Sequence, residues 1–241
     1  MKERRRRLVK VHAIVPVNVL KVSKARLTPL LNSSERAQLS VAMLEDTLEA
    51  LRKAKRLDRV TVVSADYAVR KIARSHGASW LWEGRRRGLN KAVRLGIRES
   101  KHRGASAALI IHADIPLITP REIVDFLDHA AGCSVALAPS KEGTGTNALL
   151  MQPPGVVRPL FGRDSLQKHL ALADRQGVSR RVIRTRGISF DVDEPKDLRR
   201  LMHRPMRNGT GRFLREMRRR KLTNTSESVN IRFVTQQKMK V

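Results

Sequence analysis

Apolar runs and amphipathic stretches alternate along this chain, and the alternation predicts strands and helices in turn. Strands are expected where the apolar runs fall, at residues 11–17, 59–64, 79–83 and 107–113. Between the first two runs, apolar residues recur at helical spacing from Leu39 to Leu51. A strand–helix repeat of about 25–30 residues is typical of a three-layer α/β domain with a largely parallel sheet.

Capping residues mark where two of the helices begin. Asn32 stands three residues before Glu35, and Thr119 stands three residues before Glu122, with Pro120 in the first turn of the second helix. In this spacing each side chain satisfies a backbone N–H group that the helix leaves unpaired. We therefore expect helices to begin next to Asn32 and Thr119.

The pattern changes after Pro139. Further strands are predicted at residues 134–139, 147–152, 181–185 and 188–192, with helices at residues 165–176 and 195–202. Three parts are expected: a basic arm at residues 1–10, an α/β domain at residues 11–202 and a basic extension at residues 203–241. The extension is predicted to hold a helix at 210–222 and a strand at 229–234.

Composition narrows the function classes. No apolar run approaches the roughly 20 residues that a membrane span needs, and Cys133 is the single cysteine, so no disulfide can form within the chain. We therefore expect a cytoplasmic protein that does not bind membranes. The net charge of +28 attracts polyanions, either small polyphosphates or nucleic acid. Because the aromatic residues form no stripe interleaved with basic ones, nucleic-acid binding is the alternative rather than the main hypothesis.

Asp114 follows the apolar run at residues 107–113, and Pro116 prevents the strand from continuing in the middle of a sheet. In open α/β sheets, ligands bind beyond the carboxyl ends of the strands. A carboxylate at this position is suited to hold a metal ion or a nucleotide, whereas a solvated aspartate that starts a turn is the alternative.

Lys21, Lys24 and Arg26 lie in the loop that follows the first strand. Cations set among backbone N–H groups at such a loop can cradle a triphosphate, although a solvated basic loop has the same composition. Asn90 begins the helix predicted at 90–103 and is expected at the same edge of the sheet. The sequence thus places one anion site next to Asp114.

Asp191 and Asp193 are two residues apart at the end of a predicted strand. Residues at this spacing share one face of a strand, so both carboxylates can converge on a divalent cation. Alternatively, Asp193 only helps to start the helix at Pro195.

The segments 143–147 and 161–165 indicate a second anion site. The first offers unhindered backbone N–H groups and two threonine hydroxyls, and the second leads into a helix N-terminus beside Arg163 and Ser165. A hairpin loop and a serine-capped helix are the alternative interpretation. Two anion sites beside a metal site predict transfer between two phosphorylated molecules, for which an ionised phosphate nucleophile needs no general base.

An ordered set of short motifs covers residues 11–202. The motifs are Lys24-Ala25-Arg26-Leu27, Gly88-Leu89-Asn90, Ala113-Asp114-Ile115-Pro116-Leu117, Gly145-Thr146-Asn147-Ala148-Leu149, Phe161-Gly162 with Ser165 and His169, and Asp191-Val192-Asp193-Glu194-Pro195. In this order the set resembles the 2-phospho-L-lactate guanylyltransferase family, which acts in the biosynthesis of coenzyme F-420. The resemblance implies a Rossmann-like nucleotide-diphospho-sugar transferase fold with a mostly parallel, mixed sheet.

The resemblance also implies a reaction and a role for each matched residue. GTP and 2-phospho-L-lactate would give lactyl-2-diphospho-5'-guanosine and pyrophosphate, with Mg²⁺ as cofactor in a homodimer. Alternatives are the same chemistry on phosphoenolpyruvate or 3-phosphoglycerate, or another nucleotidyltransferase. Lys24, Arg26 and Asp114 would be catalytic, and Lys21, Lys24, Arg26 and Asn90 would bind GTP. Thr146, Gly162 and Ser165 would bind the acid, and Asp114, Asp191 and Asp193 would ligate the metal ion.

Two positions depart from the family pattern. Asn18 stands where the family often has lysine, and Ala25 stands where it often has serine. Loss of the lysine removes one possible phosphate contact, which Lys21 could replace.

Overall fold

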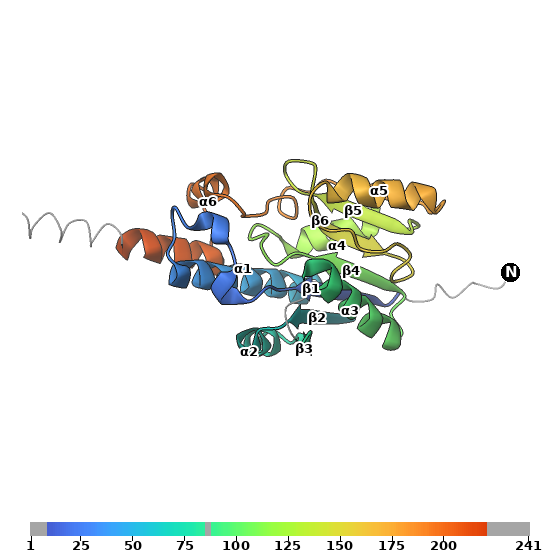
Figure 1. The fold of residues 1–241 in the computed structure, drawn as a ribbon, viewed down its shortest axis with the longest axis horizontal. Helices are drawn as coiled ribbons and strands as arrows, with labels where there is room; N and C mark the ends of the chain where they lie inside the picture. Colours follow the sequence, from blue (N-terminus) through green and yellow to red (C-terminus); the bar gives the residue numbers. More distant parts are fainter. Residues whose placement is uncertain (1–8, 85–87, 221–241) are drawn as a thin grey trace, which may run out of the picture.

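A seven-stranded mixed sheet forms the centre of the protein (Figure 1), as a computed structural model shows for residues 9–84 and 88–220. The strands are β1 (Val11–Pro16), β2 (Arg59–Ser64), β3 (Ser79–Trp82), β4 (Ala107–Ile111), β5 (Val135–Pro139), β6 (Thr146–Met151) and β7 (Arg180–Val182). The helices are α1 (Ser33–Ala54), α2 (Tyr67–Ser75), α3 (Leu89–His102), α4 (Pro120–His129), α5 (Ser165–Arg175) and α6 (Pro195–Met202). Both predicted capping boxes are present, at the starts of α1 and α4.

The strand order is β3-β2-β1-β4-β6-β5-β7. Strands β1 to β4 pair in parallel, whereas β6 runs antiparallel to both of its neighbours, β4 and β5. The reversal of β6 brings its first residue, Thr146, to the edge where the parallel strand β4 ends, since Ala148 pairs with Ile111. The start of β6 and the ends of β1 and β4 therefore meet at one edge of the sheet.

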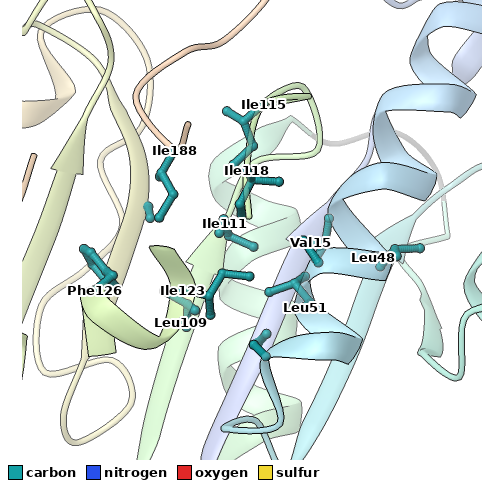
Figure 2. Close-up of a cluster of buried hydrophobic side chains, with 14 of the residues drawn as sticks. Val15, Leu48, Leu51, Leu109, Ile111, Ile115, Ile118, Ile123, Phe126 and Ile188 are labelled. Carbon is teal, nitrogen blue, oxygen red and sulfur yellow. The ribbon is translucent and has the colours of Figure 1, made fainter. Parts of the chain in front are cut away.

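Two hydrophobic clusters cover the two faces of the sheet, which gives the three layers predicted from the sequence. On one face, α1, α2 and α4 pack on β1, β2 and β4, and Figure 2 shows side chains of α1 and α4 in this cluster. On the other face, α3 and α5 supply the cover. Each fully buried leucine, isoleucine or phenylalanine contributes roughly 1.5–3 kcal/mol through the area it removes from water. Cys133 is buried, as expected of a core residue.

Close contact fixes α3 against β1. A Cβ atom added to Gly96 would lie 2.5 Å from a side-chain carbon of Ile14, so only glycine allows this approach. The N-terminus of α3 is thereby held over the edge where β1 ends.

A third cluster joins α1 to the C-terminal part of the chain. Phe190, Leu198, Leu214 and Met217 are among its members, so helical residues 209–220 pack beside α1 and α6 (Figure 1). Asp46 of α1 accepts hydrogen bonds from the backbone N–H groups of Gly209 and Thr210. The helix predicted at 210–222 is confirmed as far as residue 220, and the strand predicted at 229–234 lies outside the described residues, as does most of the arm at 1–10.

The strand predicted at 188–192 is wrong. Residues 186–189 form turns, and residues 190–192 pair with no strand. Ile188, Phe190 and Val192 are nevertheless buried at every second position, which imitates the alternation of a strand. The Val192 N–H donates instead to the carbonyl of Asp114, which ties this segment to the end of β4.

No helix among residues 9–84 and 88–220 has both the length and the apolar character that a membrane crossing requires.

Candidate functional site

A cavity of about 620 Å³ lies at the edge where β1 and β4 end. Its lining comes from the end of β1 and the loop after it, α1, the residue after β3, the N-terminus of α3, the segment after β4 and the segment before α6. Lys24, Arg26 and Asp114 line it together with Asp193. Four of the predicted site residues, far apart in the sequence, therefore share one cavity.

Two short 3₁₀ turns, Leu20–Val22 and Ala25–Leu27, shape the loop after β1. Buried Leu20 and Leu27 anchor the turns, and the Leu20 N–H donates to Asp66 across 3.0 Å. Between the turns, Lys24 adopts the left-handed conformation with φ of 52°. Residues with side chains seldom adopt this conformation.

The Lys24 ammonium lies between two carboxylates. Its Nζ atom is 2.5 Å from Asp114 Oδ2 and 2.7 Å from Asp193 Oδ1, and the Lys24 side chain is only 10% exposed. Burial alone would lower the pKa of Lys24, but the charges of Asp114 and Asp193 outweigh it and hold that pKa above its ordinary value. Lys24 is therefore fully charged at neutral pH.

Asp114 has one carboxylate oxygen that could still bind a cation. Burial by itself raises the pKa of this carboxyl, but Lys24 and then His112 more than compensate and hold the pKa below its usual value, so Asp114 is ionised. Its second oxygen, Oδ1, is buried and accepts no hydrogen bond from the described residues. A buried carboxylate oxygen without a partner is unfavourable unless a ligand supplies one.

Asp191 is an electrostatic neighbour of Asp114 and Asp193, but its side chain is hydrogen-bonded to Asn147 rather than to Lys24. Asn147 donates hydrogen bonds to Asp191 Oδ1 at 3.2 Å and to the carbonyl of Ile188 at 2.9 Å. Burial raises the pKa of Asp191; the Asn147 hydrogen bond opposes that rise, whereas the charges of Asp114 and Asp193 add to it. The three carboxylates predicted to ligate metal are thus electrostatic neighbours.

Lys141 holds the segment around Asp191 in place. Its Nζ atom donates to the Asp191 carbonyl at 2.9 Å and lies 2.6 Å from buried Asp197 Oδ1 of α6. Asp197 in turn accepts hydrogen bonds from the backbone N–H groups of Asp193 and Glu194. Lys141 and Asp197 were not expected from the sequence, because their contact depends on bringing the β5–β6 loop next to α6.

The remaining predicted GTP ligands have different positions. Arg26 is exposed and lines the cavity, whereas Lys21 is exposed and does not line it. The side-chain amide of Asn90 is engaged on both sides, since its Nδ2 donates to the Phe161 carbonyl and its Oδ1 accepts from the Phe161 N–H. Asn90 therefore ties α3 to the segment before α5, and its contact with a nucleoside stays a prediction.

The predicted acid-binding residues form a compact group. Ser165 Oγ donates to Thr146 Oγ1 at 3.2 Å, and Thr146 Oγ1 lies 3.3 Å from His169 Nδ1. The other ring nitrogen of His169 accepts from the Leu160 N–H, and burial lowers the pKa of this histidine to about 4. Gly162 has φ of 122°, a conformation that favours glycine, just before the start of α5. Thr146 and Ser165 do not line the 620 Å³ cavity, and their contact with an acid stays a prediction.

Metal ligation depends on more than these side chains. Within residues 9–84 and 88–220, no group of three or more His, Cys, Asp or Glu side chains is arranged to hold a metal ion. Mg²⁺ commonly takes one or two carboxylates and completes its shell with substrate phosphates and water. Asp114 and Asp193, which converge on one cation already, fit that mode of binding.

Comparison with known proteins gives a consistent result. Residues 11–237 match the family described as "Guanylyl transferase CofC like". A phosphoenolpyruvate guanylyltransferase of Sphaerobacter thermophilus is 39% identical over 80% of this chain and 94% of its own length. A phosphoenolpyruvate guanylyltransferase of Rubrobacter xylanophilus is 43% identical over 79% of this chain and 93% of its own length. A 2-phospho-L-lactate guanylyltransferase of Methanobrevibacter smithii is 32% identical over 86% and 91%.

Solved structures confirm the fold. A protein of Desulfovibrio desulfuricans G20, assigned as a nucleotide-diphospho-sugar transferase, superposes with a TM-score of 0.71 at 16% identity over 86% of this chain and 94% of that one. A nucleotidyl transferase from Methanothermobacter gives a TM-score of 0.62 at 18% identity, over 86% of this chain and 99% of that one. The predicted nucleotide-diphospho-sugar transferase fold is therefore correct.

Proposed function

Because this chain belongs to the CofC-like guanylyl transferase family, we propose that it transfers the guanylyl group of GTP to a phosphorylated three-carbon acid. A phosphate oxygen of the acid attacks the α-phosphorus of GTP; that P–O bond forms as the bond to the β-phosphate breaks, and pyrophosphate leaves. The observation that carries the proposal is the ion-paired group of Lys24, Asp114 and Asp193 inside the cavity. The product would serve the biosynthesis of coenzyme F-420, as the resemblance implies.

Charge neutralisation is the task that these residues can perform. Triphosphate oxygens entering the cavity would meet the Lys24 ammonium and, from the exposed side of the loop, the Arg26 guanidinium. The nucleophile is a phosphate monoester with a second pKa of about 6, so it is largely ionised at neutral pH and no side chain has to remove a proton. This agrees with a cavity in which Lys24, Asp114 and Asp193 form ion pairs rather than an acid and a base.

Mg²⁺ is the cofactor that we propose for this site. Asp114 and Asp193 would hold it, with Asp191 as their neighbour. Asp114 Oδ1 accepts no hydrogen bond from residues 9–84 and 88–220, which supports this assignment. When bound, the ion would supply positive charge to the triphosphate as pyrophosphate leaves. A cytoplasmic location and a homodimer stay predictions from the sequence; light scattering on the purified chain tests the second.

Two acids are candidates for the acceptor. The family resemblance implies 2-phospho-L-lactate, and a 2-phospho-L-lactate guanylyltransferase is 32% identical to this chain. Relatives named for phosphoenolpyruvate are 39% and 43% identical, which favours the enol acid as the better substrate of this chain.

Pyrophosphate release tests the proposal. The purified chain is assayed with Mg²⁺ and with GTP, ATP or CTP, each combined with phosphoenolpyruvate, 2-phospho-L-lactate or 3-phosphoglycerate. We expect release only with GTP plus one of the first two acids, and mass spectrometry of the product identifies the acid. Folded protein that releases no pyrophosphate with any pair would contradict the proposed function.

A further inference from the structure

A third carboxylate, Glu83, lines the same cavity but belongs to its other end. Glu83 directly follows β3, the edge strand, whereas Asp114 follows β4. Three strand spacings separate β3 from β4 in the sheet order, which corresponds to about 14 Å at roughly 4.8 Å per spacing. The cavity thus has one end with the ion-paired group of Lys24, Asp114 and Asp193 and a second end, beside β3, with the carboxylate of Glu83.

Apolar side chains also line the cavity. Val22 is 51% exposed and Leu89 is 38% exposed, although both are large hydrophobic residues. Both line the cavity, as do Leu20 and Ala92. Exposed apolar side chains at the wall of a cavity are suited to contact the faces of a flat ring, since ligand sites combine apolar walls with a few polar groups that set orientation.

The backbone fixes the position of Glu83. Its N–H donates to the carbonyl of buried Ser64 at the end of β2, and the chain turns directly afterwards at Gly84, whose φ is 75°. Trp80 and Trp82 of β3 precede Glu83, and both pack against the ring of Tyr67. The ring centroid of Tyr67 is 5.3 Å from that of Trp80 and 5.5 Å from that of Trp82. The carboxylate therefore extends from a well-supported strand end.

We propose that Glu83 selects guanine, by accepting hydrogen bonds from the N1–H and the 2-amino group of the base. An ionised carboxylate only accepts hydrogen bonds, and the two adjacent donors on this edge of guanine match its two oxygens. Adenine and cytosine each present a ring-nitrogen lone pair in place of the N1–H donor, so a carboxylate repels them. This inference rests on the proposed function, because it assigns the base of the GTP whose phosphates would meet Lys24.

Nucleotide preference measures the effect of Glu83. Inosine triphosphate keeps the N1–H donor and lacks the 2-amino group. For the wild-type chain we expect kcat/KM to be about 10-fold lower with inosine triphosphate than with GTP, the usual size of one charge-assisted hydrogen bond. In Glu83→Gln we expect the KM for GTP to rise about 10- to 100-fold with kcat nearly unchanged, and the preference for GTP over inosine triphosphate to fall to about 2-fold.

Two further variants complete the experiment. Glu83→Asp keeps the carboxylate and should recover part of the preference for GTP. Glu216→Gln, at an exposed carboxylate outside the cavity lining, should leave both nucleotides unaffected. Thermal unfolding of each variant checks that the fold is intact.

The outcomes separate this inference from the proposed function. An unchanged KM and an unchanged nucleotide preference in Glu83→Gln would overturn the assignment of Glu83 while the enzyme remains a guanylyltransferase. A wild-type chain without turnover on any pair contradicts the proposed function instead. In that case, the affinities for GTP and inosine triphosphate, measured by calorimetry, still test the role of Glu83. Glu83→Gln should weaken the binding of GTP by a larger factor than the binding of inosine triphosphate.

Discussion

Two polar clusters lie near the same edge of the sheet and differ in charge and in access to solvent. Lys24, Asp114 and Asp193 form ion pairs, line the cavity and have side chains that are 10%, 25% and 47% exposed. Thr146, Ser165 and His169 form a network without ion pairs and are 2%, 2% and 0% exposed. One cluster is therefore an ionic group in contact with solvent, and the other is a sealed hydrogen-bond network.

This difference indicates what each cluster can do when a substrate arrives. Ion pairs at the wall of a cavity can be exchanged, so an anionic ligand can take over the Lys24 charge and a cation can take over the two carboxylates. A sealed network with satisfied partners instead fixes the relative position of β6 and α5. Substitutions in the first cluster should affect turnover, whereas those in the second should affect stability and acid affinity.

The largest effect is expected for Lys24→Met. The substitution removes the charge that would meet the triphosphate and leaves Asp114 buried without its counter-ion. We expect kcat/KM for GTP to fall by about 10³-fold or more in the pyrophosphate-release assay. Lys71→Met, at an exposed position on α2, is the matched control and should keep its activity. Activity within a few-fold of wild type in Lys24→Met would show that the ionic cluster does not serve the reaction.

Asp114→Asn should have the next largest effect. We expect kcat to fall about 10²-fold while the fold is kept, because one carboxylate of the proposed magnesium site is lost. The concentration of Mg²⁺ that gives half-maximal activity should rise as well. Asp193→Asn is the comparison, and its smaller burial predicts a smaller loss. Equal turnover of Asp114→Asn and wild type would exclude Asp114 from the site.

His169 makes the stability of the folded protein depend on pH. Its pKa is about 4 in the folded protein, because burial disfavours the charged ring, and 6.5 is the ordinary value in an unfolded chain. The unfolded chain therefore binds the proton first, and folding stability is lost as the pH falls from about 6.5 towards 4. Between pH 6.5 and 5 this linkage amounts to about 2 kcal/mol.

Urea unfolding of the wild type and of His169→Gln at several pH values measures this loss. The variant has no titrating group at this position, so the difference between the two unfolding free energies should change across that pH window. A constant difference would mean that His169 takes up its proton equally in both states.

Ser165→Ala should have the smallest effect. If the second cluster borders the acid subsite, loss of this hydroxyl raises the KM for the acid about 5- to 10-fold and leaves the KM for GTP unchanged. Steady-state kinetics with each substrate varied in turn measures both constants. A change in the KM for GTP alone would contradict the division into two anion sites.

The sequence predicted most of the sheet because its strands are buried on both faces. β1, β4 and β6 are buried along their whole length, and most of their residues are therefore apolar. The error at residues 188–192 has the opposite cause. Phe190 and Val192 are buried in the cluster with α1 and α6, and Ile188 is buried in the cluster with α4, all without a neighbouring strand. Periodicity cannot distinguish this situation from a strand.

The site was predictable in its residue types and only partly in its contacts. That Lys24 and Asp114 share an edge follows from strands that run parallel, although the two residues are 90 positions apart. The ion pair itself depends on the left-handed backbone of Lys24, for which the sequence carries no glycine signal. The contacts of Lys141 and the two-sided bond of Asn90 to Phe161 depend on how loops cross, and no local pattern encodes that.

The two tryptophans of β3 provide an intrinsic fluorescence signal for ligand binding. Trp80 and Trp82 are the only two tryptophans of the chain, and they lie three residues and one residue before Glu83. All of the intrinsic indole fluorescence therefore originates beside one end of the cavity. A purine stacked or bound there should quench that emission, so nucleotide arrival can be followed in real time by stopped-flow mixing, without a label and without turnover.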